Sequence, residues 1–135
     1  MKKIVSILVG IAIMCLFGGC SLTSTERIKL RDLDFTVLSE DKIPDELKTI
    51  VEEKKAENFK LTYSDKQYLY ICIGYGQQET GGYSIAVNEL YLTDNAIYVS
   101  TSLLGPDASE KSNKTPSYPY IVIKTEFLEQ TVIFE

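Results

Sequence analysis

Cysteine is the residue type in this sequence with the most scope for chemistry, because a thiolate can act as a nucleophile or as a metal ligand. The chain contains three cysteines, Cys15, Cys20 and Cys72, and no histidine. Cys72 lies in the apolar run 68–73, where burial favours the neutral thiol, and no imidazole is available to act as its base. We therefore expect Cys72 to be a buried and unreactive core residue.

The absence of histidine narrows the other kinds of site that the chain can build. Hydrolytic triads and most zinc sites use imidazole, and a calcium loop needs carboxylates at alternate positions, which no segment supplies. The densest acidic cluster, Glu52, Glu53 and Glu57, falls on a predicted helix and is typical of a solvated face. We expect no catalytic residue, no metal and no cofactor, and a protein that is not an enzyme.

Cys20 follows a segment typical of a bacterial export signal. Two lysines precede the apolar run 4–17, whose 14 residues are fewer than the roughly 20 that a spanning helix needs. The ending Gly18-Gly19-Cys20 resembles a lipobox, although Phe17 stands where such motifs usually have leucine. Residues 1–19 are therefore predicted to be a lipoprotein signal peptide, with Cys20 as the lipid attachment site. A simple signal peptide cut near Gly18 and an uncleaved anchor are the alternatives.

Lipid on Cys20 predicts a location at the cell surface or the extracytoplasmic face of a membrane, because two or more acyl chains anchor a protein stably. Residues 20–33 are predicted to be the tether, since 21–26 are mostly small and polar.

Removing the first 19 residues leaves 116, which suits one domain, here 34–135. The loss of Lys2 and Lys3 changes the formal net charge from −5 to −7, which speaks against nucleic acid and anionic headgroups as partners.

The patterns from Asp34 onward predict an α+β domain, an antiparallel sheet or open sandwich of about six or seven strands with one packed helix. The helix is predicted to start near Pro44 and end near Lys55, with an apolar stripe that rests on the sheet. The stripe consists of Ile43, Leu47, Ile50 and Val51. Strands are expected at 34–38, 59–63, 67–75, 84–92, 96–104, 118–123 and 131–134.

The expected pairing follows from the short connections between these strands. Strands joined by short turns usually pair as antiparallel neighbours, so we expect 67–75 to pair with 84–92, and 84–92 with 96–104. Segment 67–75 is apolar on both faces, which is typical of a central strand covered on each side. Segment 131–134 is also apolar and is expected to be paired centrally. Pro119 restricts the start of its strand to an edge or an unpaired position.

The loop between the two central strands is unusually rich in glycine. Four glycines fall within 74–85, and Gly81-Gly82 supplies the positive φ that residues with a Cβ avoid. Tyr83 then stands at the rim of the domain. If strand direction alternates cleanly, the polar segment 105–117 emerges at the same end as this loop. A plain hairpin turn is the structural alternative.

Two motifs in these loops resemble a known family. Thr80-Gly81-Gly82-Tyr83-Ser84-Ile85, followed by Thr115-Pro116-Ser117-Tyr118-Pro119-Tyr120, resembles the C-terminal domain of PrcB, a lipoprotein subunit of a bacterial surface protease complex. The likeness covers residues 34–135. A weaker likeness is to chagasin-like protease inhibitors, whose first binding loop reads Asn-Pro-Thr-Thr-Gly-Tyr. The present loop lacks that proline and has one more glycine.

The resemblance implies a binding module whose partner is a protein, by analogy a secreted or surface protease. Nine tyrosines and no tryptophan supply amphipathic rings of the kind that interfaces use as anchors. The residues expected to contact the partner are Thr80, Gly81, Gly82, Tyr83, Pro116, Tyr118 and Pro119. The alternative is a structural or small-ligand module of the cell envelope, with tyrosines lining a groove for a glycan or a peptide.

Overall fold

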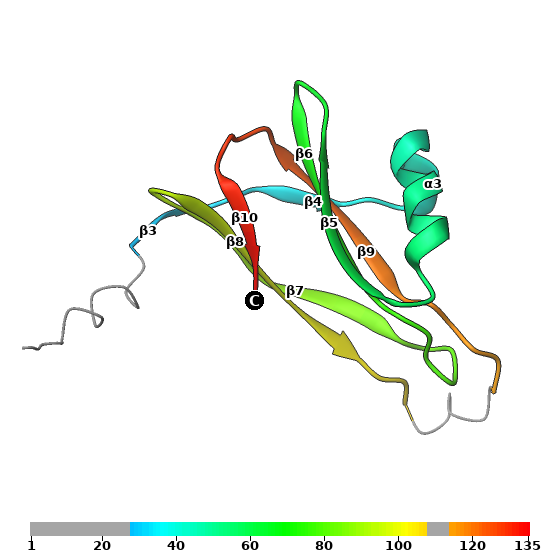
Figure 1. Ribbon diagram of the computed structural model, residues 1–135. Coiled ribbons are helices and arrows are strands. Elements are labelled where there is room, and N and C mark those ends of the chain that lie inside the picture. Colours follow the sequence, from blue (N-terminus) through cyan, green and yellow to red (C-terminus); the bar gives the residue numbers. More distant parts are fainter. Residues whose placement is uncertain (1–27, 108–113) are drawn as a thin grey trace, which may run out of the picture.

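The computed structural model describes residues 28–107 and 114–135. Within them lie eight strands, one α-helix and one short 3-10 helix. The strands form two four-stranded sheets, and the helix covers the outer face of one of them (Figure 1). The α+β prediction is confirmed, with one or two strands more than the six or seven expected.

The elements in chain order are β3 (Lys29–Asp32), β4 (Phe35–Val37), η1 (Glu40–Lys42), α3 (Asp45–Lys54), β5 (Asn58–Ser64), β6 (Tyr68–Tyr75), β7 (Ser84–Thr93), β8 (Ala96–Leu104), β9 (Tyr120–Glu126) and β10 (Thr131–Phe134). One sheet has the strand order β10-β8-β7-β3 and the other the order β4-β9-β6-β5. All pairs are antiparallel except β10 with β8.

Strand β6 is covered on both faces, as its continuous apolar sequence predicts. Side chains alternate across a strand, so Leu69, Ile71 and Ile73 point between the sheets. Tyr70 and Cys72 point to the opposite face, under the helix. The core is therefore double, with one layer between the sheets and a smaller one between β6, β9 and α3.

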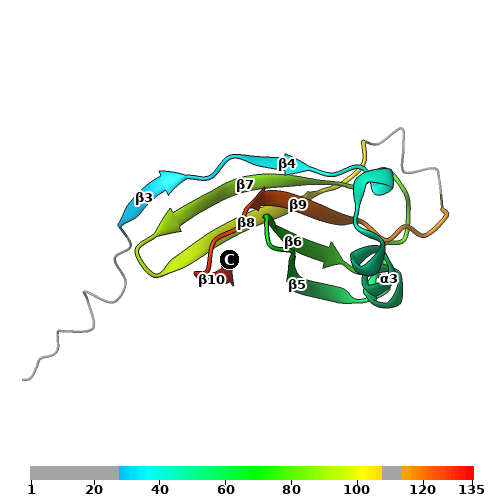
Figure 2. The same ribbon diagram turned by 90° about the horizontal axis from the view of Figure 1, so that it is seen from above.

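Helix α3 is held to the sheet by the predicted apolar stripe. Leu47 and Val51 are fully buried, and Ile43 is buried just before the helix. Ile50 lies at the margin of the stripe and is half-buried. Asp45 and the neighbouring glutamate lie in the first turn and a lysine in the last, which complements the helix dipole. The second view shows α3 at one end of the molecule (Figure 2).

The expected pairing of 67–75 with 84–92 is wrong, because β6 and β7 lie in different sheets. Both edges of β6 are already occupied, one by β5 and the other by β9. The glycine-rich connection is therefore no hairpin turn and instead crosses from one sheet to the other. The pairing of β7 with β8 is confirmed over Ser84 to Leu92.

Two further expectations are corrected at the ends of the domain. Strand β10 is an edge strand that runs parallel to β8, not a central one, and its side chains alternate between exposed and half-buried. Within the described residues, the first strand is β3, which lies in the range 20–33 that was predicted to be a tether. This strand pairs with β7 from Lys29 to Asp32. Every residue in it is exposed, so its sequence shows no buried apolar face that would distinguish it from a linker.

The lipid-attachment prediction concerns residues outside the described part of the chain. Residues 1–19 and Cys20 lie there, as does the region 21–27. Within 28–107 and 114–135, no helix is both long and apolar enough to span a membrane.

Cys72 is expected to resist thiol reagents in the folded protein. It is fully buried, and burial raises the pKa of its thiol to about 12, so the reactive thiolate is scarce at neutral pH. With a disulfide reagent at pH 8, the thiol at position 72 of a Cys15→Ser/Cys20→Ser variant should react only after denaturant is added. Rapid stoichiometric labelling without denaturant would show that this part of the core opens readily.

Candidate functional site

The loop after β6 and the segment before β9 lie side by side at one end of the molecule (Figures 1 and 2). Gln78 and Ser117 donate backbone N–H groups to each other's carbonyl oxygens at 2.8 and 3.0 Å. The Ser117 Oγ also donates to the carbonyl oxygen of Thr80 at 2.7 Å. We call residues 78–83 and 116–119 together the rim. The expectation that these two segments reach the same end is confirmed.

Backbone hydrogen bonds fix the base of the rim to the sheet. The N–H of Tyr75 donates to the carbonyl of Pro119 at 3.0 Å, and that of Gln77 donates to Ala56 at 3.3 Å. Pro119 thus lies just before β9 and not within it, where its carbonyl is paired and its missing N–H leaves no strand hydrogen bond unmade. Gly76 turns the chain with a φ of 76°, and a Cβ there would lie 3.1 Å from the Asn58 side chain. Glycine is needed at that position for both reasons.

Only one residue of the pair Gly81-Gly82 adopts the positive φ that was predicted for this loop. Gly82 has a φ of 87°, whereas Gly81 does not adopt a positive value. The residue that follows, Tyr83, is half-buried. Its ring lies against Gly105 at the end of β8, where an added Cβ would be 3.8 Å from Cε1 of the ring. Tyr83 therefore stands on the side of the rim next to the β8 sheet.

Tyr118 stands on the other side of the rim, next to the helix. It is 37% exposed, and the Lys55 ammonium lies 5.7 Å from its ring centroid, within range of a cation–π contact. Lys55 also pairs with Glu52 at 2.9 Å, and this hydrogen bond raises the pKa of the lysine. The structure thus brings the two predicted segments together but gives their tyrosines different neighbours.

A groove of about 330 Å³ opens beside Tyr118. Its lining residues are Val37, Leu38, Glu40, Ile43, Tyr118, Pro119, Tyr120, Ile121 and Val122. Val37 is 50% exposed, and burial raises the pKa of Tyr120, whose hydroxyl is therefore neutral at physiological pH. Val37 and its neighbours were not predicted as site residues. They precede Tyr118 by some eighty positions in the sequence, and only the pairing of β4 with β9 brings them close to it.

The described residues offer this site no metal. Among 28–107 and 114–135, no group of three or more histidine, cysteine, aspartate or glutamate side chains is placed to hold a metal ion.

Two packed sheets with loops gathered at one end define a small β-sandwich, a class in which a rigid scaffold positions end loops for binding. Residues 69–126 match the family model described as PrcB C-terminal. The matched segment includes β7 to β9, all of β6 but its first residue, and all seven predicted contact residues. The resemblance to the PrcB C-terminal family found in the sequence is therefore confirmed over this segment. No curated protein and no solved structure matches the chain.

Proposed function

We propose that this protein is an extracytoplasmic lipoprotein that binds a protein partner, a secreted or surface protease, through the rim. The match of residues 69–126 to the PrcB C-terminal model supports association with a protein. The protein acts in this proposal as a binding module and not as an enzyme. The lipid on Cys20 supplies its only contact with the membrane.

The observation that carries the proposal is the reciprocal bonding of Gln78 and Ser117, reinforced by the bond from Ser117 Oγ to Thr80. Loops that are ordered before binding lose less conformational entropy when the partner arrives. The rim therefore supports one preformed surface built from two segments that are distant in sequence. This surface presents Tyr83 and Tyr118 as its aromatic residues.

The groove beside Tyr118 adds a concave feature to this surface. Interfaces concentrate binding energy where a large side chain of one partner fills a pocket of the other, near the centre of the contact. Val37 and Tyr118 leave apolar surface open at the groove, and the buried Ile43 also lines it. In this account, an apolar side chain of the partner enters the groove.

A pull-down tests the proposal. The chain from Ser21 is used as bait against the detergent-solubilised envelope and the secreted fraction of the source organism, beside a Tyr83→Ala/Tyr118→Ala variant. We expect the unmodified bait to retain a protease and the variant to lose it, with nearly equal thermal midpoints. Equal retention by both baits would contradict the rim as the contact surface. Absence of any specific protein would favour the small-ligand alternative.

The lipid anchor is tested separately with Cys20→Ser in cells. Without the thiol no acyl chain can be attached, so the protein should leave the detergent phase on phase partitioning and lose incorporation of labelled fatty acid. Cys15→Ser is the matched control, since this change keeps the attachment site. The lipid anchor would be contradicted if the unmodified chain and the Cys20→Ser variant were recovered equally in the detergent phase and neither carried fatty-acid label.

A further inference from the structure

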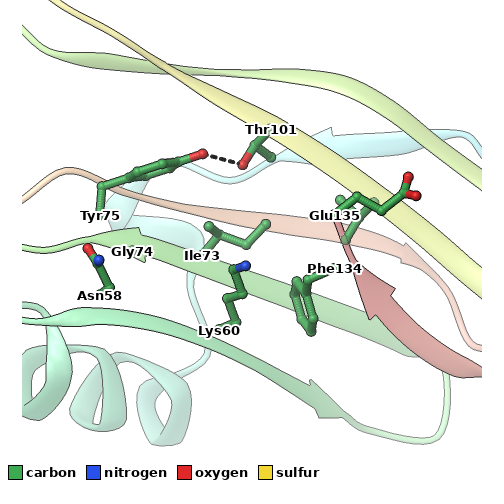
Figure 3. A pocket seen from close by; sticks show the side chains of 9 residues that line it. Asn58, Lys60, Ile73, Gly74, Tyr75, Thr101, Phe134 and Glu135 are labelled. Atoms are coloured by element: carbon green, nitrogen blue, oxygen red, sulfur yellow. Dashed lines mark hydrogen bonds between the residues drawn. The ribbon is translucent and has the colours of Figure 1, made fainter.

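A cavity of about 320 Å³ lies between the two sheets, away from the groove beside Tyr118 (Figure 3). Its lining residues are Asn58, Lys60, Ile73, Gly74, Tyr75, Val99, Thr101, Phe134 and Glu135. They come from β5 and β6 of one sheet and from β8, β10 and the residue after β10 in the other. No contact residue predicted from the sequence lies among them.

The cavity exists because β5 is polar on the face where the core between the sheets would otherwise continue. Phe59, Leu61 and Tyr63 alternate along β5 and pack on the helix side of the sheet. The residues between them therefore face the other sheet. Lys60 is paired in register with the buried Ile73, so a charged side chain stands beside a core residue at the open edge of the sandwich.

Lys60, an exposed residue of β5, brings one positive charge to this cavity, whose lining also includes the acidic Glu135. Its ammonium lies 6.0 Å from the ring centroid of Phe134, and within the described residues it forms no ion pair. The carboxylate of Glu135 points away from it in the view of the cavity (Figure 3). An anion that enters the cavity can therefore pair with Lys60 without displacing an ion pair of the described fold.

The opposite part of the cavity offers apolar surface and one hydroxyl pair. Ile73 and Val99 are buried core residues, and with the Phe134 ring they form apolar walls. Tyr75 and Thr101 form a hydrogen bond between their hydroxyl oxygens at 2.6 Å. In that bond one hydroxyl donates its proton and the other accepts. The hydroxyl that accepts keeps its own proton, which it can donate to a ligand.

Size limits the ligand. About 320 Å³ is near the lower end of the range for small-molecule sites and corresponds to roughly ten waters of liquid. We propose that this cavity binds a small organic carboxylate with an apolar body, with Lys60 pairing with the carboxylate and Ile73, Val99 and Phe134 contacting the body. This site is separate from the rim and does not depend on the proposed protein partner.

The test uses the full chain in lipid nanodiscs with labelled isoleucine and valine methyl groups. 3-Phenylpropionate is titrated beside its neutral analogue 3-phenylpropanol, with empty nanodiscs to measure partition of each probe into lipid. We expect saturable shifts of the Ile73 and Val99 methyl signals. Lys60→Met keeps the apolar stem and removes the charge, so it should weaken binding of the acid by about tenfold or more and leave that of the alcohol unchanged. Lys60→Arg should preserve binding of the acid.

Lys66→Met is the matched control, because Lys66 lies in the exposed turn after β5 and does not line the cavity. This variant should bind the acid as the unmodified chain does, and well-dispersed methyl spectra of the free variants, changed only near the substituted residue, establish that each is folded. Absence of saturable shifts at Ile73 and Val99 would overturn the proposal. Equal affinity of the Lys60→Met variant and the unmodified chain for the acid would overturn it too, as would binding of an acidic peptide without binding of the free acid.

Discussion

Leu47→Ala is expected to lower the free energy of unfolding by about 2–5 kcal/mol, the range for truncating a large buried aliphatic side chain. Leu47 is fully buried between α3 and the outer face of the β6 sheet, where it packs in one cluster with Tyr70, Cys72 and Val122. These neighbours lie on a sheet and cannot collapse fully into the space left by the side chain. Urea denaturation followed by circular dichroism measures the change.

Ile50→Ala is the matched control for this variant. It lies in the same helix and also shortens an aliphatic side chain, but Ile50 is only half-buried. Its effect should be clearly smaller, because less apolar area leaves water at this position on folding. An equal loss in both variants, or a loss below about 1 kcal/mol for Leu47→Ala, would contradict the packing of α3 on the sheet.

Ser117→Pro is expected to reduce retention of the protein partner by about tenfold or more, while the thermal midpoint changes less than in Leu47→Ala. Proline has no backbone N–H, so the bond from Ser117 to the carbonyl of Gln78 is lost together with the hydroxyl bond to Thr80. The two segments of the rim would then no longer be fixed against each other, and ordering them would oppose binding. Quantitative pull-down measures the retention.

Ser117→Ala separates the two contributions of this residue. It removes the hydroxyl bond to Thr80 but keeps both backbone bonds to Gln78, so retention should fall less than in the proline variant. Full retention by Ser117→Pro, with its backbone fold intact, would show that a preformed rim is not needed for association.

Local pattern was sufficient to predict the helix, seven of the eight strands of the described residues, and the burial of the helix and of β6. The apolar run at 67–75 indicated a strand covered on both faces, and β6 is packed between the second sheet and α3. The stripe of the helix likewise predicted that Leu47 and Val51 face the sheet. Such features depend on the period of hydrophobicity within one segment, which the sequence displays directly.

Pairing across the fold could not be predicted in the same way. The rule that neighbouring strands pair failed for β6 and β7, because β5 and β9 compete for both edges of β6. Nothing local in 131–134 distinguishes a central strand from the parallel edge strand β10. β3 was not predicted for a similar reason. All of its side chains are exposed, so its sequence has no alternation of buried and exposed residues, and it forms a strand by pairing with β7.

The candidate site shows the same division. The motifs around Tyr83 and Tyr118 were visible in the sequence, and the structure joins their segments. The bond between Gln78 and Ser117 was not predicted, because it is a contact between distant loops that no spacing encodes. The contribution of Val37 to the groove and the position of Lys60 beside the cavity likewise depend on strand register.

The central claim is that both segments of the rim form the contact surface together. Hydrogen–deuterium exchange of the protein, alone and in complex with the partner retained by it, tests this most directly. We predict added protection of peptides covering 78–83 and 116–119 together. Little change is expected at β3, which is an edge strand of its sheet. Added protection confined to other surfaces, such as β3 and β4, with the rim unchanged, would contradict the account.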